Sequence, residues 1–218
     1  MPQQADQIHR KPIIGLAGGI GSGKSFVSKV FGELGCLVIN SDEQAKQAYN
    51  DVAVREKIRQ WWGETVFTGA NAVDRSAIAK RVFQNPTERT RLEQLLHPWI
   101  NAARQRLMDA RANDAQVLAF VWDTPLLFEN GLNRQCNAVV FVEAPIELRL
   151  KRVTERRRWV PEELSRRENL QWPLDKKKKI SDYVIVNTAD ADAGKTSVRD
   201  QVREILSLIL SKKVSPIR

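Results

Sequence analysis

Short runs of consecutive apolar residues alternate along the chain with longer stretches in which apolar residues recur every three or four positions. The short runs predict buried strands over 12–17, 36–40, 116–123, 138–143 and 183–187. The longer stretches predict helices over 24–34, 43–49, 54–62, 75–83, 88–108 and 198–210, with one more after Pro145. Strands that alternate with helices favour an α/β fold, here a three-layer α/β/α sandwich with a five-stranded parallel sheet.

One long segment, from residue 43 to residue 113, contains no convincing strand. It lies between the second and third predicted strands, so we interpret it as a helical subdomain inserted into a single domain of residues 12–218. Residues 1–11 then form an N-terminal tail. The core of the domain consists of 12–42, 115–150 and 180–211.

The composition fits a soluble globular protein, because 42% of the 218 residues are hydrophobic and 28% are charged. No apolar run approaches the roughly 20 residues that span a bilayer, and the polar N-terminus lacks the apolar stretch of a signal peptide. Cys36 and Cys136 are too few and too far apart for a disulfide framework or a zinc site. We expect both to be buried and reduced, in a cytoplasmic protein without membrane association.

The formal net charge of +9 is concentrated in one segment. Between Arg149 and Lys179 there are twelve Lys and Arg residues against five Asp and Glu residues. A local excess of this kind indicates a binding site for anions more than a basic coat over the whole surface. Within the segment we expect the lysine run 176–179 to be a solvated helix face.

Residues 18–25 match the phosphate-binding pattern G-x-x-x-x-G-K-[ST] at every fixed position. Glycines let the backbone N–H groups turn toward phosphate oxygens, and the helix that follows presents its positive end to the same oxygens. Lys24 would reach the β- and γ-phosphates, and the Ser25 hydroxyl would bind Mg²⁺. The alternative is a glycine-rich turn with a chance lysine and serine. The motif follows a predicted strand and opens a predicted helix, which favours the phosphate-binding interpretation.

The rest of the chain narrows the class of P-loop protein. A GTPase should carry N-K-x-D and D-x-x-G, and neither string occurs in the sequence. A large remodelling ATPase needs a longer chain. A short P-loop protein with a basic segment late in the chain is typical of small-molecule kinases, whose arginines close over the transferred phosphate.

Two carboxylates follow predicted strands, at the sheet edge where ligands bind in open α/β folds. Asp42 comes just after the second strand and could accept a proton from a hydroxyl, or alternatively cap the next helix. Asp123 ends the third strand, as a metal-site acid would, or simply as a turn residue.

The basic segment contains arginines with helical spacing. Arg149, Arg152 and Arg156 stand at i, i+3 and i+7, which places them on one face of a helix. Such a face is either solvated or, in a protein that binds ATP, a lid that clamps phosphates. We interpret residues 151–179 as a helical lid.

Several segments together resemble dephospho-coenzyme A kinases, and the resemblance covers nearly the whole chain. They are the loop 14–25 in its Gly-Gly-Ile-Gly-Ser-Gly form, Leu-Leu-His-Pro at 95–98, Pro-Leu-Leu-Phe-Glu at 125–129, Arg75 with Phe83, Arg152 with Arg156, Arg167 with Gln171, and the strand 181–187. The resemblance implies transfer of the ATP γ-phosphate to the ribose 3′-hydroxyl of dephospho-CoA, with Mg²⁺ as cofactor. It also implies that 43–113 binds CoA. We expect small-molecule partners only, with no nucleic acid and no obligate protein partner.

The resemblance carries site residues over to this chain in four groups. Catalytic roles are implied for Asp42, as the base, and for Lys24 and Arg152. The ATP-binding residues are Gly19, Gly21, Ser22, Gly23, Lys24, Ser25, Phe26, Arg156 and Asn187. The acceptor-binding residues are Asp42, Arg75, His97, Pro125, Leu126 and Glu129. Ser25 would bind Mg²⁺, with Asp42 or Asp123 as a further ligand through water.

The chain departs from the family pattern at Asn40-Ser41-Asp42, where the family has D-A-D, and at Val186, where it has Asp. Three rival functions remain open. One is a kinase for a nucleoside or nucleotide, and another is a nucleic-acid-binding ATPase that uses the basic segment. The third is a protein that binds nucleotide without catalysis, which the change at Asn40 keeps open.

Overall fold

The computed structural model describes residues 11–69, 71–188 and 193–212, so the expected N-terminal tail lies outside the described residues apart from Lys11. The chain forms two compact units. Residues 1–39 and 112–218 make up what we call the sheet unit, and residues 40–111 make up the helical unit.

The sheet unit is built on a sheet of five strands in the order β2-β5-β1-β6-β7. Strand β1 runs parallel to β5 and β6, and β6 runs parallel to β7. This confirms the predicted five-stranded parallel sheet. Its strands are β1 (Ile13–Gly18), β2 (Leu37–Asn40), β5 (Phe120–Asp123), β6 (Ala138–Glu143) and β7 (Tyr183–Val186).

Strand β5 begins four residues later than the apolar run predicts. The N–H of Val117 donates to the carbonyl of Asp114 at 3.0 Å, which makes a turn where the run begins. The Lys11 ammonium donates to the carbonyls of Asp114 and Val117 and stabilises that turn. Apolar character alone does not reveal this competing turn.

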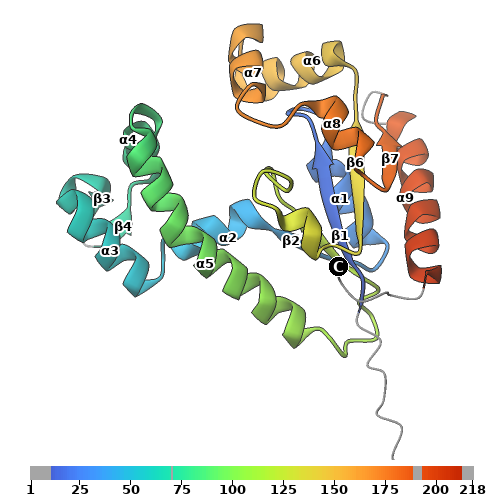
Figure 1. Cartoon of the computed structure of the whole chain (residues 1–218), viewed down its shortest axis with the longest axis horizontal. Helices are drawn as coiled ribbons and strands as arrows, with labels where there is room; N and C mark the ends of the chain where they lie inside the picture. Colours follow the sequence, from blue (N-terminus) through green and yellow to red (C-terminus); the bar gives the residue numbers. More distant parts are fainter. Residues whose placement is uncertain (1–10, 70, 189–192, 213–218) are drawn as a thin grey trace, which may run out of the picture. The chain divides into compact units, whose positions relative to one another are not determined.

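Helices cover both faces of the sheet (Figure 1). On one face α1 (Lys24–Glu33) and α9 (Ala193–Ser211) pack over a core that contains Val140 and Val142 of β6. On the other face lie α8 (Leu174–Lys179) and the 3₁₀ turn η2 (Leu132–Gln135). Because the side chains of a strand alternate between faces, Phe141 is buried on the second side, beside Leu174. The predicted three-layer α/β/α arrangement is thereby confirmed.

Helix α1 ends where the sequence indicates. Gly35 has a φ of 90°, a conformation that glycine adopts at little cost. The N–H of Cys36 then donates to the carbonyl of Phe31 at 3.1 Å, which closes the last turn of the helix. The chain is thereby turned directly into β2.

The helical unit has its own core. It contains α2 (Ser41–Ala48), α3 (Val52–Trp62), the 3₁₀ turn η1 (Gly63–Val66), α4 (Arg75–Gln84) and α5 (Pro86–Ala110). The buried side chains at its centre are Ala48, Val54, Ile58, Trp62, Val66, Ile78, Leu92, Leu96 and Ile100. The interpretation of this segment as an insertion of helices is borne out.

The expectation that this segment lacks strands is wrong in one place. Strands β3 (Phe67–Thr68) and β4 (Ala72–Val73) form a small antiparallel hairpin. The Arg59 guanidinium lies 4.3 Å from the centre of the Phe67 ring and covers it. Strands of two residues are too short to produce a readable alternation of apolar and polar positions.

After β6 come α6 (Ile146–Arg157) and α7 (Pro161–Glu168), which precede α8. Arg158 ends α6 in a left-handed conformation, with a φ of 56°. The ring of Trp159 contacts two guanidiniums, those of Arg157 at 4.8 Å and Arg167 at 4.3 Å. These cation–π contacts connect the end of α6 to α7 through the Trp159 ring.

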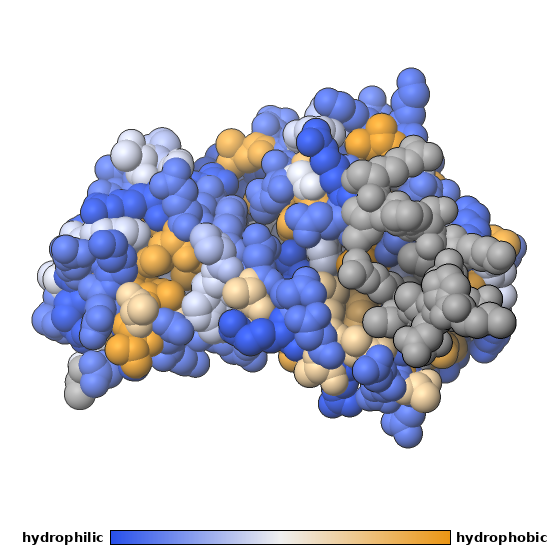
Figure 2. Space-filling view, turned by 60° about the horizontal axis from the view of Figure 1, so that its bottom comes forward, coloured by the Kyte–Doolittle hydropathy of each residue, from blue (hydrophilic) through white to orange (hydrophobic). Residues whose placement is uncertain are grey.

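One face of the molecule is shown by hydropathy in Figure 2. The face in Figure 2 is largely hydrophilic outside the grey atoms, with hydrophobic residues in separate groups. Within the described ranges, every helix is too short or too polar to cross a bilayer. Cys36 is buried, and burial raises the pKa of its thiol to about 12. The expectation that both cysteines are buried fails for Cys136, which is only half-buried.

Candidate active site

The glycine-rich loop connects the carboxyl end of β1 to the start of α1 at Lys24. Gly21 and Gly23 have φ values of 78° and 89°, which favour glycine. A Cβ on Gly21 would lie 2.6 Å from the carbonyl oxygen of Arg149. One on Gly23 would lie 2.2 Å from Nδ2 of Asn187. Glycine is therefore required at both positions. It adopts the positive φ of the loop, and it leaves room for Arg149 and Asn187 to pack against the loop.

Two of the predicted site residues hold this loop from outside. Nδ2 of Asn187, which is 3% exposed, donates to the carbonyl of Ser22 at 2.8 Å. Nη1 of Arg152 donates to the same carbonyl at 3.1 Å, and Nη2 donates to Oδ1 of Asn187 at 3.3 Å. Asn187, which directly follows β7, and Arg152 of α6 thus both contact the Ser22 carbonyl of the loop. Arg156, one turn further along α6, is exposed.

Lys24 forms an ion pair with Asp123, which is 2% exposed at the end of β5. The hydroxyl of Ser28 donates to the other carboxylate oxygen at 3.1 Å. Asp123 is therefore more than a turn residue, because a buried carboxylate is retained only where charged and polar partners compensate it.

The Ser25 hydroxyl and the Asp123 carboxylate have the chemistry of magnesium ligands. Mg²⁺ in phosphoryl-transfer sites takes one or two protein oxygens and completes its coordination with phosphates and water. No cluster of three or more His, Cys, Asp or Glu side chains suited to a metal occurs among the described residues. The Ser25 hydroxyl and the Asp123 carboxylate are hard oxygen donors of the kind the ion prefers.

Sequence reasoning missed a second ion pair on the loop. Arg149, 7% exposed, pairs with Glu168 of α7 and also donates to the carbonyl of Ile20 at 3.3 Å. Oε1 of Glu168 accepts the N–H of Ile20 at 3.3 Å. The helical spacing of the arginines points to Arg149. Glu168 is one of five acids in the basic segment, and nothing in the pattern distinguishes it.

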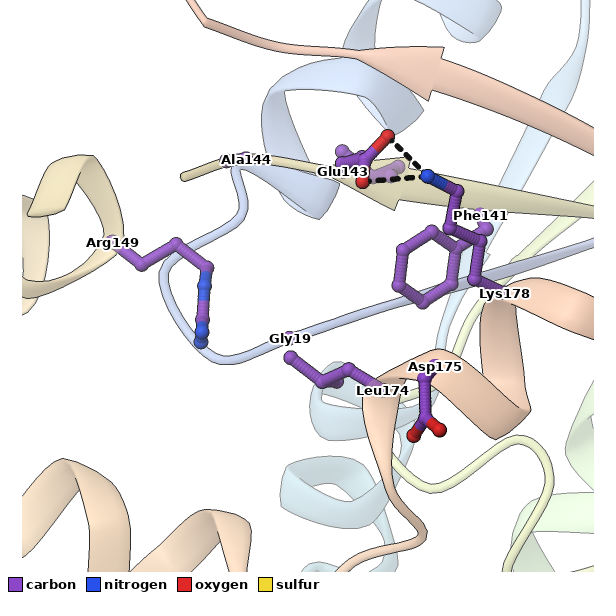
Figure 3. A pocket seen from close by; sticks show the side chains of 9 residues that line it. Gly19, Phe141, Glu143, Ala144, Arg149, Leu174, Asp175 and Lys178 are labelled. Carbon is purple, nitrogen blue, oxygen red and sulfur yellow. Dashed lines mark hydrogen bonds and ion pairs between the residues drawn. The ribbon is translucent and has the colours of Figure 1, made fainter. Parts of the chain in front are cut away.

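A pocket of about 330 Å³ lies beside the loop (Figure 3). It is lined by Gly19 of the loop, by Arg149 of α6 and by Leu174 and Asp175 of α8, among others. Glu143 and Lys178 form an ion pair of 2.7 Å across one of its edges. The pocket thus lies at the carboxyl end of β6, where ligands bind in α/β folds.

The segment after β5 is tied to α8. Glu129 forms an ion pair of 2.7 Å with Lys177 and accepts the N–H of Trp172 at 2.8 Å. The rings of Phe128 and Trp172 stack with centres 6.1 Å apart. Pro125 is exposed and Leu126 half-buried on the same segment. Contact of these three predicted acceptor residues with substrate stays a prediction.

The expectation that the lysine run 176–179 is a solvated face is wrong for Lys177, which is 2% exposed. Its ammonium also donates to Oε1 of Gln171 at 3.0 Å. Four consecutive helical residues cannot share one face, so one member of the run points inward. A buried ammonium requires the carboxylate of Glu129 as its partner.

In the helical unit, Asn40 caps α2. Its Oδ1 accepts the N–H of Asp42 at 2.9 Å and that of Glu43 at 3.1 Å. The alternative in which Asp42 caps the helix is therefore wrong; Asp42 lies in the first turn with an exposed side chain. An amide oxygen caps a helix as well as a carboxylate does, so the change to Asn40 preserves the start of α2.

Two further acceptor residues also lie in the helical unit. Arg75 begins α4. Burial raises the pKa of Tyr49, and the nearby positive charge of Arg75 opposes that rise. His97 is exposed on α5, next to Pro98 inside the helix. The predicted site residues are thus divided between the two units, with Asp42, Arg75 and His97 in the helical one.

Comparisons with known proteins agree in identifying one family. The family model for dephospho-CoA kinase matches residues 12–193. A dephospho-CoA kinase of Chlorobium luteolum is 33% identical over 209 residues, which cover 93% of each chain. One of Bacillus licheniformis is 37% identical over 179 residues, covering 81% of this chain and 88% of its own.

Solved structures share the fold. The crystal structure of TT1252 from Thermus thermophilus has a TM-score of 0.77 at 28% identity and covers 93% of this chain and 100% of its own. Dephospho-CoA kinase from Campylobacter jejuni has a TM-score of 0.66 at 24% identity, with 89% and 97% covered. On the evidence of the family model and the relatives above 30% identity, the chain belongs to the dephospho-CoA kinase family.

Proposed function

We propose that this protein transfers the γ-phosphoryl group of ATP to the ribose 3′-hydroxyl of dephospho-CoA, giving CoA and ADP in the last step of coenzyme A biosynthesis. The observation that carries the proposal is the glycine loop that opens α1 at Lys24, with the buried Asp123 beside the lysine. We further propose that residues 43–113 bind the CoA part of the acceptor, that 151–179 act as a lid, and that the enzyme works in the cytoplasm.

The loop and its basic neighbours supply charge stabilisation. The N–H groups of the loop and the ammonium of Lys24 bind the phosphates, while Arg152 is placed on the loop by its bonds to the Ser22 and Gly21 carbonyls. Asp42 takes the proton of the 3′-hydroxyl as that oxygen bonds to the γ-phosphorus and the bond to the β–γ bridging oxygen breaks. Since phosphoryl transfer has a loose transition state, positioning and charge account for most of the rate.

The cofactor in this proposal is Mg²⁺, which the Ser25 hydroxyl would hold, with Asp123 or Asp42 as a further ligand through water. When bound, the ion neutralises charge on the β- and γ-phosphate oxygens. Asp123 is already buried beside the loop, which supports it as the protein carboxylate nearest to the phosphates. Lys24 then exchanges part of its interaction with Asp123 for one with phosphate.

Purified protein with ATP and Mg²⁺ is expected to release ADP only when dephospho-CoA is added. The measurement is ADP release with and without dephospho-CoA, against adenosine, AMP and CMP as control acceptors. Release with one of the controls alone would support the nucleoside or nucleotide kinase. Stimulation of ADP release by DNA or RNA would support the nucleic-acid-dependent ATPase. ATP binding without any ADP release would support a protein that binds nucleotide without catalysis.

Replacing Asp42 with Asn is expected to lower kcat about a hundredfold, at the low end for loss of a general base because the transition state is loose. ATP affinity and the thermal midpoint should stay near wild type, since the Asp42 side chain is exposed and Asn40 provides the cap of α2. The measurements are single-turnover rates, ATP titration and thermal unfolding. Unchanged turnover would remove Asp42 from the role of base.

A further inference from the structure

Arg149, which is buried, and Glu168, which is half-buried, form an ion pair in direct contact with the phosphate loop. Their side chains are 8% and 20% exposed. A Cβ on Gly19 would lie 2.9 Å from Nη1 of Arg149 and 3.2 Å from Oε1 of Glu168. The glycine at position 19 therefore lets the pair reach the backbone of the loop.

The carboxylate oxygen of Glu168 has the donors that a phosphate oxygen would have in such a loop. It accepts the N–H of Ile20, one of the backbone groups between Gly18 and Lys24, and it accepts a charged hydrogen bond from Arg149. Backbone N–H groups of a phosphate loop and arginine guanidiniums are the usual partners of phosphate oxygens. Oε1 of Glu168 thus occupies a position that is suited to a phosphate oxygen of a bound nucleotide.

Arg149 has capacity for further interactions. Its buried Nε has no hydrogen-bond partner in the described part of the chain, and Nη1 makes the two bonds already given. A guanidinium with an unused donor beside a phosphate loop can bind a phosphate oxygen without leaving the loop. Arg149 also lines the pocket of Figure 3 together with Gly19.

We propose that Arg149 is a phosphate-binding residue for the nucleotide, and that Glu168 holds its guanidinium on the loop by occupying the place of a phosphate oxygen until ATP displaces it. The inference rests on the proposed function, since it assigns two more residues to the same nucleotide site. The exchange of Glu168 for phosphate leaves the charge on Arg149 compensated throughout.

The proposal predicts opposite effects from removing the two partners. Replacing Arg149 with Gln removes a cation and leaves the Glu168 carboxylate near the phosphates, so the Kd for ATP should rise about ten- to a hundredfold. Replacing Glu168 with Gln removes the competing charge and leaves the guanidinium, so the Kd should fall severalfold. The measurement is calorimetric titration with ATP and with ADP, without any acceptor.

Helix α7 offers a matched control. Glu163 forms ion pairs with Arg166 and Arg167, at 2.9 Å and 2.5 Å, with a side chain 25% exposed. Glu163→Gln removes a paired carboxylate of the same helix without touching the loop, so the Kd for ATP should stay at the wild-type value. Thermal midpoints without nucleotide, measured for all three variants, show whether each protein is folded.

The outcomes separate this proposal from its alternatives. If both replacements weaken ATP binding, the pair is only a structural brace for the loop and the proposal is overturned. An unchanged Kd in Arg149→Gln also overturns it. Because no acceptor is present, a wrong acceptor assignment would leave these results intact, whereas failure of the wild-type protein to bind ATP would overturn both proposals.

Discussion

Replacing Lys24 with Met is expected to lower kcat/KM for ATP about a thousandfold or more. The ammonium of Lys24 is the charge nearest to the phosphates in the proposed mechanism, and removing a single preorganised donor from a charge-stabilising site costs about 10²–10³ in rate. Loss of a full positive charge in addition to the donor places the effect at or above the upper end. Steady-state and single-turnover rates with dephospho-CoA as acceptor measure it.

The same replacement has a second, independent effect on the fold. Asp123 is 2% exposed and loses the cation that compensates its charge, although Ser28 still donates to it. Breaking a buried pair by removing one partner costs about 3–5 kcal/mol, and the remaining hydrogen bond favours the lower figure. Denaturant unfolding of Lys24→Met against wild type measures that loss.

Adding Asp123→Asn separates the two effects. The double variant has no uncompensated carboxylate, so its free energy of unfolding should return toward wild type, while its turnover should stay at the level of Lys24→Met or below. If stability and turnover recover together, the loss in the single variant came from unfolding and Lys24 has no direct role. If neither variant loses turnover, the proposed phosphate contact of Lys24 is wrong.

The strands and most helices could be predicted from the sequence because they depend on local patterns. Strand β6 was predicted with its observed bounds, 138–143, since a fully buried strand appears as an uninterrupted apolar run. Gly35 marked the end of α1 because few residues other than glycine adopt its φ. The β3–β4 hairpin was missed because strands of two residues leave no readable alternation. The late start of β5 was missed because the turn from Asp114 to Val117 depends on a hydrogen bond that apolarity does not encode.

The positions of candidate site residues could be predicted where a sequence motif is typical of one kind of chemistry. The loop and Arg152 were singled out from spacing, and Asp123 from its place at the end of a predicted strand. In the structure Asp123 pairs with Lys24, and Arg152 donates to the carbonyl of Ser22 in the loop. Glu168 was not predictable, because its role depends on the fold bringing α7 to Ile20, 148 positions away in the sequence. The cap made by Asn40 was also missed, because Asn and Asp are both favoured at the N-cap and the sequence does not show which of Asn40 and Asp42 starts the helix.

Lys177 shows most clearly that the sequence pattern does not reveal burial, because it stands in a run of four lysines whose members have different environments. Its side chain is 2% exposed and that of Glu129 is 14% exposed, whereas the adjacent Lys178 and its partner Glu143 are 45% and 38% exposed. Both ion pairs measure 2.7 Å. Distance is therefore matched between the two pairs, and burial is what differs.

Replacing Lys177 with Met is expected to lower the free energy of unfolding by about 3–5 kcal/mol, because it leaves the Glu129 carboxylate buried without its cation. Lys178→Met should cost less than about 1 kcal/mol, because water screens an exposed pair. At this chain length the first loss corresponds to a decrease in thermal midpoint of roughly 10 °C. Denaturant unfolding and thermal scans of the two variants measure the contrast.

The double variant Lys177→Met with Glu129→Gln identifies the cause of that loss. If the uncompensated charge destabilises the single variant, the neutral amide should restore most of the stability. A double variant as unstable as Lys177→Met would mean that the lysine stabilises α8 through packing and its bond to Gln171 instead. Equal losses in Lys177→Met and Lys178→Met would contradict the argument from burial, because the two lysines share a helix, a charge and an ion-pair distance.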